Sequence, residues 1–312
     1  MTVYNRIRKT DKLRILLNNL ICLMLATTIV LFGASIKNGI IHAIRLLVNN
    51  IIPSIFPFLI LADYWSANLN VSEKSIVKRL FEFMFGINGN ALPAFLCGSV
   101  CGFPLGTKIS VDLYNKKIIS KDELQLICII SSNPSAAFVI SGIGAALYGN
   151  NLIGFVLYFS VILSACLAGF ILKNKEKTLE YSCEITRQKF NLIYSIKNAG
   201  ISLTVISSCI IFFSALISLF RVIFRSSLLN LFLAAVTEVS TACCMIKEHF
   251  AFPTPLSLSF TAFTLGFSGF SVHIQNFAFL PDCISKKKYI VSKLFIGLFS
   301  FVISYFIFAF LI

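Results

Sequence analysis

Long apolar runs fill most of this chain, and they constrain its fold more than any other feature. The first covers residues 15–36, close to the roughly 20 residues that a helix needs to cross the hydrocarbon core of a bilayer. Hydrophobic residues make up 57% of the sequence and charged residues 13%, well outside the balance of a soluble domain. We therefore expect an all-α, polytopic membrane protein, because helices satisfy their own backbone groups in lipid.

Basic residues gather in the segments between the apolar runs. Lys and Arg number 27 against 13 Asp and Glu. Short basic loops tend to stay in the cytoplasm, so we place the N-terminal flank and the segments around Lys74, Lys116, Lys173 and Lys286 on the cytoplasmic side. The sequence lacks the interleaved aromatic and basic residues of a nucleic-acid interface. We expect a lipid bilayer as the partner of this charge, and no nucleic acid.

Four apolar segments are interrupted by glycine, proline or polar residues. They read CGSVCGFPLGTK at 97–108, SSNPSA at 131–136, TEVST at 237–241 and GFSGFSVHIQ at 266–275. Irregular backbone at membrane depth survives only where protein buries it or where water or a solute reaches it. The breaks therefore indicate a solute site. A packing role is the alternative for the glycines, because Gly98 and Gly102 have the spacing of closely packed helices.

The charge on either side of a run predicts its topology. Residues 91–114 have cytoplasmic charge before and after them, which predicts a re-entrant hairpin. Residues 228–246 become a hairpin from the opposite face, because Arg221, Arg225 and Lys247 around them would all lie outside. The result is a fold with inverted repeats, each with a re-entrant hairpin and a broken helix. The alternative, in which every apolar run simply spans, stays open.

The expected organisation has four parts. Within the first repeat, residues 39–65 are predicted to form a long, kinked helix and residues 72–85 an amphipathic helix at the cytoplasmic interface. The parts are an N-terminal cytoplasmic flank with the first transmembrane helix at 1–38, the first repeat at 39–172, a cytoplasmic linker at 173–192 and the second repeat at 193–312.

Charged and amide side chains at the breaks are candidates for substrate binding. Lys108 precedes Asp112 by four residues, so it forms either an internal ion pair or an ammonium presented to an anionic solute. Pro134 opens the preceding turn beside Asn133. Glu238 is the one acidic residue embedded in a long apolar run, so it either carries a coupling proton or cation, or pairs with a donor such as Lys108.

The last break adds Ser271 and Gln275, which lie on one helix face because they are four residues apart. His273 points elsewhere and ranks below Gln275. The complete set of candidate substrate-binding residues is Gly102, Gly106, Thr107, Lys108, Ser132, Asn133, Glu238, Ser240, Thr241, Ser268, Ser271 and Gln275.

Cysteine usage argues against a metal site. Most of the ten cysteines lie inside apolar runs, where cysteine behaves as a small hydrophobe. Cys97 with Cys101, and Cys243 with Cys244, have no histidine beside them to complete a tetrahedral set. We expect no metal and no cofactor. No set of nucleophile, base and orienting group can be assembled either, so an enzyme is not expected.

The segment from Gly98 to Lys108, the Asp112-Leu-Tyr that follows and SSNPSAAF at 131–138 resemble a known family. This is the family of sporulation integral membrane proteins of the YlbJ or stage V sporulation V type, within the nucleoside-recognition Gate superfamily. The segments 237–241 and 266–275 extend the likeness to the second half, although Ala242 stands where a glycine is expected.

The resemblance implies paired Gate repeats like those of concentrative nucleoside transporters. It also implies movement of dipicolinic acid, a small aromatic dianion, across the outer forespore membrane of a bacterium. The basic flank, by contrast, is what predicts a cytoplasmic N-terminus. We expect a transporter of a small organic anion, with a proton or cation coupled to it. The alternatives are a nucleoside or related solute carrier and a non-transporting membrane scaffold of the spore envelope. The sequence leaves oligomeric state open.

Overall fold

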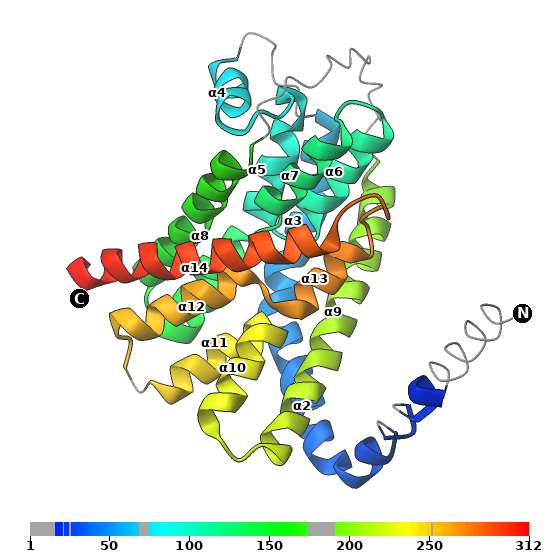
Figure 1. Ribbon diagram of the computed structural model, residues 1–312, viewed down its shortest axis with the longest axis vertical. Helices are drawn as coiled ribbons and strands as arrows, with labels where there is room; N and C mark the ends of the chain where they lie inside the picture. The colour runs from blue at the N-terminus through cyan, green and yellow to red at the C-terminus, as the bar shows by residue number, and fades with distance from the viewer. Residues whose placement is uncertain are drawn as a thin grey trace, which may run out of the picture.

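The computed structural model describes residues 16–68 except 21 and 25, residues 75–173, and residues 191–311 except 251. Every described element is a helix (Figure 1), which confirms the expected all-α class. The N-terminal flank and most of the 173–192 linker lie outside the described residues.

Several helices are long and apolar enough to cross a membrane. In the described residues there are four by length and composition, or up to six if each of two bent helix pairs counts as one span. This indicates a membrane-embedded protein. The four are α8 (Asn151–Leu172), α9 (Leu192–Ile223), α12 with α13 (Pro255–Phe277) and α14 (Lys286–Leu311).

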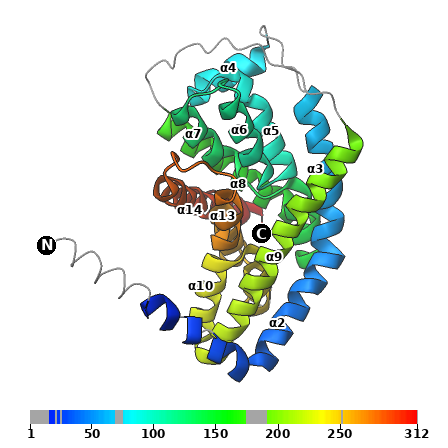
Figure 2. The ribbon, with the colours of Figure 1, turned by 90° about the vertical axis from the view of Figure 1, so that its right-hand side faces the viewer.

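The helix expected at residues 39–65 is longer than predicted. It begins at Gly33 and consists of α2 (Gly33–Leu46), the π-helical turn η1 (Leu47–Ile51) and α3 (Ile52–Asn68). The π turn and Pro57 inside α3 are features at which helices bend, in keeping with the predicted kink. The boundary expected between residues 38 and 39 falls inside α2, because Lys37 and Asn38 do not interrupt its hydrogen bonding. Both α2 and α3 pack along α9 (Figure 2).

Helix α4 (Ile76–Phe85) is amphipathic, as expected for an interfacial helix. Its buried Phe81 and Phe85 contact Phe95 of the next helix, with ring centroids 5.9 and 5.7 Å away. Gly86 ends α4 in the left-handed conformation, φ 64°. The short 3-10 helix η2 (Gly89–Ala91) then leads into the membrane-embedded part.

Two pairs of short helices enter the molecule and turn back. Each helix has 10 or 11 residues and is about 16 Å long, half of the roughly 30 Å hydrocarbon core. The members of each pair pack against one another, and the side of a membrane from which each pair enters stays a prediction. The pairs are α5 (Leu92–Cys101) with α6 (Leu105–Asn115), in the upper part of Figure 1, and α10 (Ser227–Thr237) with α11 (Val239–His249), in the lower part.

Each hairpin is followed in the sequence by a broken helix. Helix α7 (Lys121–Ser131) ends at the Asn133-Pro134 step, and the chain resumes as the π-helical η3 (Phe138–Leu147). Helix α12 (Pro255–Phe267) is separated from α13 (Gly269–Phe277) by Ser268, which has φ 74°.

The two ends of the molecule carry different basic clusters. At one end, Lys173 and Lys288 line a common cleft with Asp122, and the backbone N–H of Ser285 donates to Gln125 Oε1 (2.8 Å), which holds the start of α14 against α7. These lysine-bearing segments are among those that the charge pattern assigns to one side. Arg221 and Arg225 lie at the other end, beside the base of the α10–α11 hairpin.

Candidate functional site

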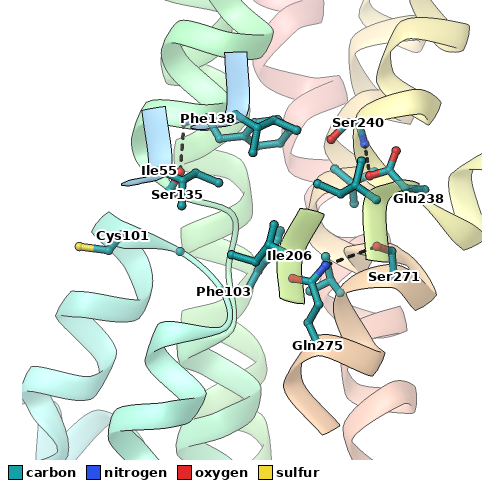
Figure 3. Close-up of a pocket in the computed structure, with 15 residues that line it drawn as sticks. Ile55, Cys101, Phe103, Ser135, Phe138, Ile206, Glu238, Ser240, Ser271 and Gln275 are labelled. Carbon is teal, nitrogen blue, oxygen red and sulfur yellow. Dashed lines mark hydrogen bonds between the residues drawn. The ribbon is translucent and has the colours of Figure 1, made fainter. Parts of the chain in front are cut away.

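The helix breaks meet at one small cavity between the two main hydrophobic clusters of the molecule (Figure 3). Its free volume is about 30 Å³, which is room for ordered water but not for an organic solute. The segments 98–108 and 237–241, far apart in sequence, therefore converge as predicted. Its polar or backbone lining comes from Gly102, Phe103, Ser135, Glu238, Ser240, Ser271 and Gln275, and the remaining lining is mostly apolar, from α3, α9 and η3.

The tip of the first hairpin is built on Gly102. This residue has φ 84° and ψ −177°, a conformation open to glycine, and a Cβ there would lie 2.6 Å from the backbone nitrogen of Ser135. The backbone N–H of Phe103 donates to the carbonyl of Asn133 (2.9 Å). The hairpin tip thus supplies a backbone partner to the break in α7, and both breaks face the cavity.

The tip of the second hairpin is built on Glu238, which is 2% exposed. Its Oε1 accepts from the backbone N–H of Ser240 (3.0 Å) and its Oε2 from that of Thr241 (2.6 Å). These are unsatisfied donors at the start of α11, where the helix dipole also favours a negative charge. Glu238 is therefore the N-cap of α11 as well as a wall of the cavity, and no contact with Lys108 explains its burial.

Gln275 carries the clearest sign of a missing ligand. Its Nε2 donates to Ser271 Oγ (3.4 Å), whereas its Oε1 has no hydrogen-bond partner in the described part of the chain. The side chain is 1% exposed and lines the cavity. A buried acceptor without a donor is costly, so this position calls for a donor from a solute or a water molecule.

His273 does not line the cavity, which agrees with its lower rank than Gln275 as a candidate site residue. It packs among the rings of Phe267, Phe270, Phe277 and Tyr289, and neither ring nitrogen has a hydrogen-bond partner among the described residues.

Some predicted site residues support the breaks without lining the cavity. Gly98 and Gly106 approach each other's Cα and the carbonyl of Ser131, so Gly106 has the packing role that was the alternative. Ser268 Oγ donates to the carbonyl of Leu265 (3.0 Å) at the break before α13. Lys108 lies on α6, partly buried, and is not part of the lining.

The other four side chains, those of Thr107, Ser132, Asn133 and Thr241, make contacts beside the cavity. Asn133 Nδ2 donates to the carbonyl of Ile130 (2.7 Å), and Thr241 Oγ1 lies 3.2 Å from Ser214 Oγ. Thr107 Oγ1 donates to Asn276 Oδ1 (2.8 Å), and Ser132 Oγ accepts from Asn276 Nδ2 (2.7 Å). These residues fix the shape of the breaks.

The sequence prediction missed Lys293, a fully buried lysine on α14. Its Nζ donates to the carbonyl of Ser132 (2.6 Å), and Tyr289 OH donates to Ser132 Oγ (2.8 Å) from one turn earlier on the same helix. The amino group thus lies at the C-terminal end of α7, where backbone carbonyls lack partners within the helix. A lysine inside an apolar run was the available signal, by the same criterion that selected Glu238.

No family model, curated protein or solved structure matches this chain. Within residues 16–68, 75–173 and 191–311 there is also no group of three or more His, Cys, Asp or Glu side chains that could hold a metal ion. The interpretation of the site therefore depends on its own geometry.

Proposed function

We propose that the protein is a membrane transporter of a small organic solute, with the central cavity as its substrate site. One observation carries this proposal: interrupted helices from both halves of the chain bring irregular backbone, Glu238 and Gln275 to the same cavity. Discontinuous helices of this kind form the binding sites of secondary transporters, because unwound backbone at membrane depth is tolerated only where it is buried or lines a cavity.

The order of elements supports inverted repeats as part of the proposal. The hairpin α5–α6 is followed by the broken helix α7–η3 and then by the long α8, and the hairpin α10–α11 is followed by α12–α13 and then by α14. The hairpins approach the cavity from opposite ends of the molecule (Figure 1). The same order would occur in the paired repeats of concentrative nucleoside transporters.

The proposed substrate is a small organic anion, of which dipicolinic acid is the example from the sequence resemblance. Lining residues occur at or near the starts of α6, α11 and α13, where backbone N–H groups favour an anion. The side chain of Lys293 also donates to the α7 break from its far side.

Glu238 sets a condition on anion transport. A dianion next to an ionised carboxylate in a closed, apolar cavity would be repelled strongly. Either a proton on Glu238 or a cation beside it removes this repulsion, so we propose that the anion travels together with a proton or a cation. The cavity of about 30 Å³ is also far smaller than the roughly 300–1,000 Å³ of usual ligand pockets. The described conformation is therefore closed, and the hairpin tips must separate to admit a solute.

A nucleoside is the second candidate substrate. Gln275 Oε1 is an unpartnered acceptor, and the carboxylate of Glu238 accepts hydrogen bonds as well. Both suit the hydroxyl and amine donors of a nucleoside better than they suit a dianion.

Uptake into proteoliposomes tests both candidates. We expect purified protein to take up labelled dipicolinate when an inward proton or sodium gradient is imposed, and Glu238→Gln to lose at least about tenfold in rate because it removes the charge that responds to the coupled cation. Asp282→Asn, the same change at an exposed loop position, is the matched control and should keep the rate of the unmodified protein.

The outcomes separate the alternatives. Uptake of uridine that dipicolinate does not compete would support the nucleoside carrier. The transporter proposal is wrong if neither solute enters under either gradient and if Glu238→Gln restores the phenotype of a deletion strain as fully as the unmodified protein does. That result would favour the scaffold role.

A further inference from the structure

A second cavity lies at the end of α9, beside the base of the α10–α11 hairpin in the lower part of Figure 1. It has a volume of about 460 Å³ and does not share a lining residue with the central cavity. Its polar lining consists of Arg221, Arg225, Ser227, Asn230, Glu248 and His249.

The two arginines of this cavity do not form an ion pair with any residue that the structure describes. Arg221 and Arg225 are both exposed. The expected topology places both arginines outside, on the side that the positive-inside rule disfavours for basic residues. A role in setting the orientation of the protein in the membrane therefore does not explain their presence. Two guanidinium groups that share a cavity are suited to bidentate binding of a phosphate or carboxylate.

Asn230 indicates which hydrogen-bonding groups the ligand carries besides its negative charge. It is 7% exposed, and its Nδ2 donates to the carbonyl of Phe224 (2.7 Å), which fixes the amide so that Oδ1 remains an acceptor. That oxygen has no hydrogen-bond partner among the described residues. Glu248 is a second acceptor on the same lining. A simple anion would satisfy the arginines and leave the buried Oδ1 of Asn230 unpaired, so we expect the ligand to carry hydrogen-bond donors as well.

We infer that this cavity binds a phosphate group that carries adjoining hydroxyl groups, as glycerol phosphate does. The phosphate oxygens accept from Arg221 and Arg225, while the hydroxyl groups donate to Asn230 and Glu248. The same chemistry occurs in free glycerol phosphate and in the head group of phosphatidylglycerol. Exposed apolar side chains near the cavity, Leu228 at 66% and Phe232 at 63%, offer a surface for acyl chains.

Thermal unfolding of the full chain in a non-ionic detergent tests the inference. We expect sn-glycerol 3-phosphate, or dioleoyl phosphatidylglycerol in mixed micelles, to raise the unfolding temperature by several degrees, because a ligand that binds the folded state stabilises it. Sulfate at matched ionic strength has no O–H donor and should bind at least about tenfold more weakly. Dioleoyl phosphatidylcholine at the same mole fraction is the lipid control.

Variants assign the effect to the cavity. Arg221→Gln with Arg225→Gln should abolish the stabilisation. Arg221→Lys with Arg225→Lys keeps both charges but should weaken binding, because the bidentate geometry is lost. Arg79→Gln, the same change on exposed α4 at the other end of the molecule, should retain it.

Each outcome is informative. Stabilisation by the soluble phosphate alone identifies a free solute as the ligand, and stabilisation by phosphatidylglycerol alone identifies the lipid. The inference is overturned if neither stabilises the unmodified protein, if sulfate is as effective as glycerol phosphate, or if both double variants respond as the unmodified protein does.

Discussion

At the residue scale, Glu238 and Lys293 both provide hydrogen-bond partners for backbone groups at a helix end, Glu238 at an N-terminal end and Lys293 at a C-terminal end. Glu238 accepts two backbone N–H groups at the start of α11, and Lys293 donates to a carbonyl just beyond the end of α7. Each break in a helix leaves such groups without partners, and in an apolar core a charged side chain satisfies them well. These two buried side chains therefore help to stabilise the interruptions around the cavity.

Replacement of Lys293 tests this role. Lys293→Met removes the donor and leaves the Ser132 carbonyl buried and unpaired, so we expect a loss of about 1–3 kcal/mol in the free energy of unfolding. Lys293→Gln can still donate and should lose less. Thermal or denaturant unfolding in detergent measures both, with the exposed Lys197→Met on α9 as the matched control. Equal stability of Lys293→Met and the unmodified protein would contradict the role.

Part of the site could be predicted from the sequence, because some of its residues are polar in an otherwise apolar run or stand where a helix is interrupted. Glu238 is acidic in an apolar run, and Gly102, Ser240, Ser271 and Gln275 fall directly at breaks; all five line the cavity. Which way a polar side chain turns is decided by packing, and the sequence does not encode it locally. Thr107 and Ser132 lie one helix turn or less from lining positions, yet they bond to Asn276 of α13.

At the element scale, helix length separates hairpins from spans. Basic residues on both sides of 91–114 predicted that this run returns to its starting face, and two helices of about 16 Å in its place agree with that topology. The residue at which the α2–η1–α3 helix starts is harder to predict from the sequence, because the apolar run continues through the turn at Phe32 without a change in composition. Composition therefore predicts which elements exist better than it predicts where they bend.

The hairpin tip allows a test with a matched glycine. Gly102→Ala places a Cβ 2.6 Å from the Ser135 nitrogen and forces alanine into φ 84° and ψ −177°, a region almost restricted to glycine, whereas Gly149→Ala introduces a positive φ (70°) into open space. We expect Gly149→Ala to cost about 1 kcal/mol of stability, the usual cost of alanine at a left-handed position, and Gly102→Ala clearly more. Unfolding in detergent measures the difference. If both variants lose the same stability, the contact between the α5–α6 tip and the α7 break is not tight.

At the scale of the whole molecule, the described conformation leaves too little room in the central cavity for an organic solute. Polar groups from both halves meet there, yet the free volume is only about 30 Å³. The apolar side chains of α3 and α9 complete the wall, so access requires movement of a hairpin against this pair of long helices (Figure 2). Neither the sequence nor a closed structure gives the size of that movement, since both report one packed arrangement.

Cys101 is a native probe of that movement. It lines the central cavity and is 2% exposed, whereas Cys128 of α7 is 0% exposed and lies away from it. A hydrophilic thiol reagent cannot reach either residue in the closed state, because buried cysteines are inert. If the hairpin tips separate during transport, Cys101 becomes modified over minutes while Cys128 does not, and a bound substrate slows the modification. Peptide mass spectrometry of the labelled protein in proteoliposomes distinguishes the two sites. Equal and negligible labelling of both cysteines under an imposed ion gradient would mean that the cavity never opens to water, and a closed cavity cannot serve as an alternating-access site.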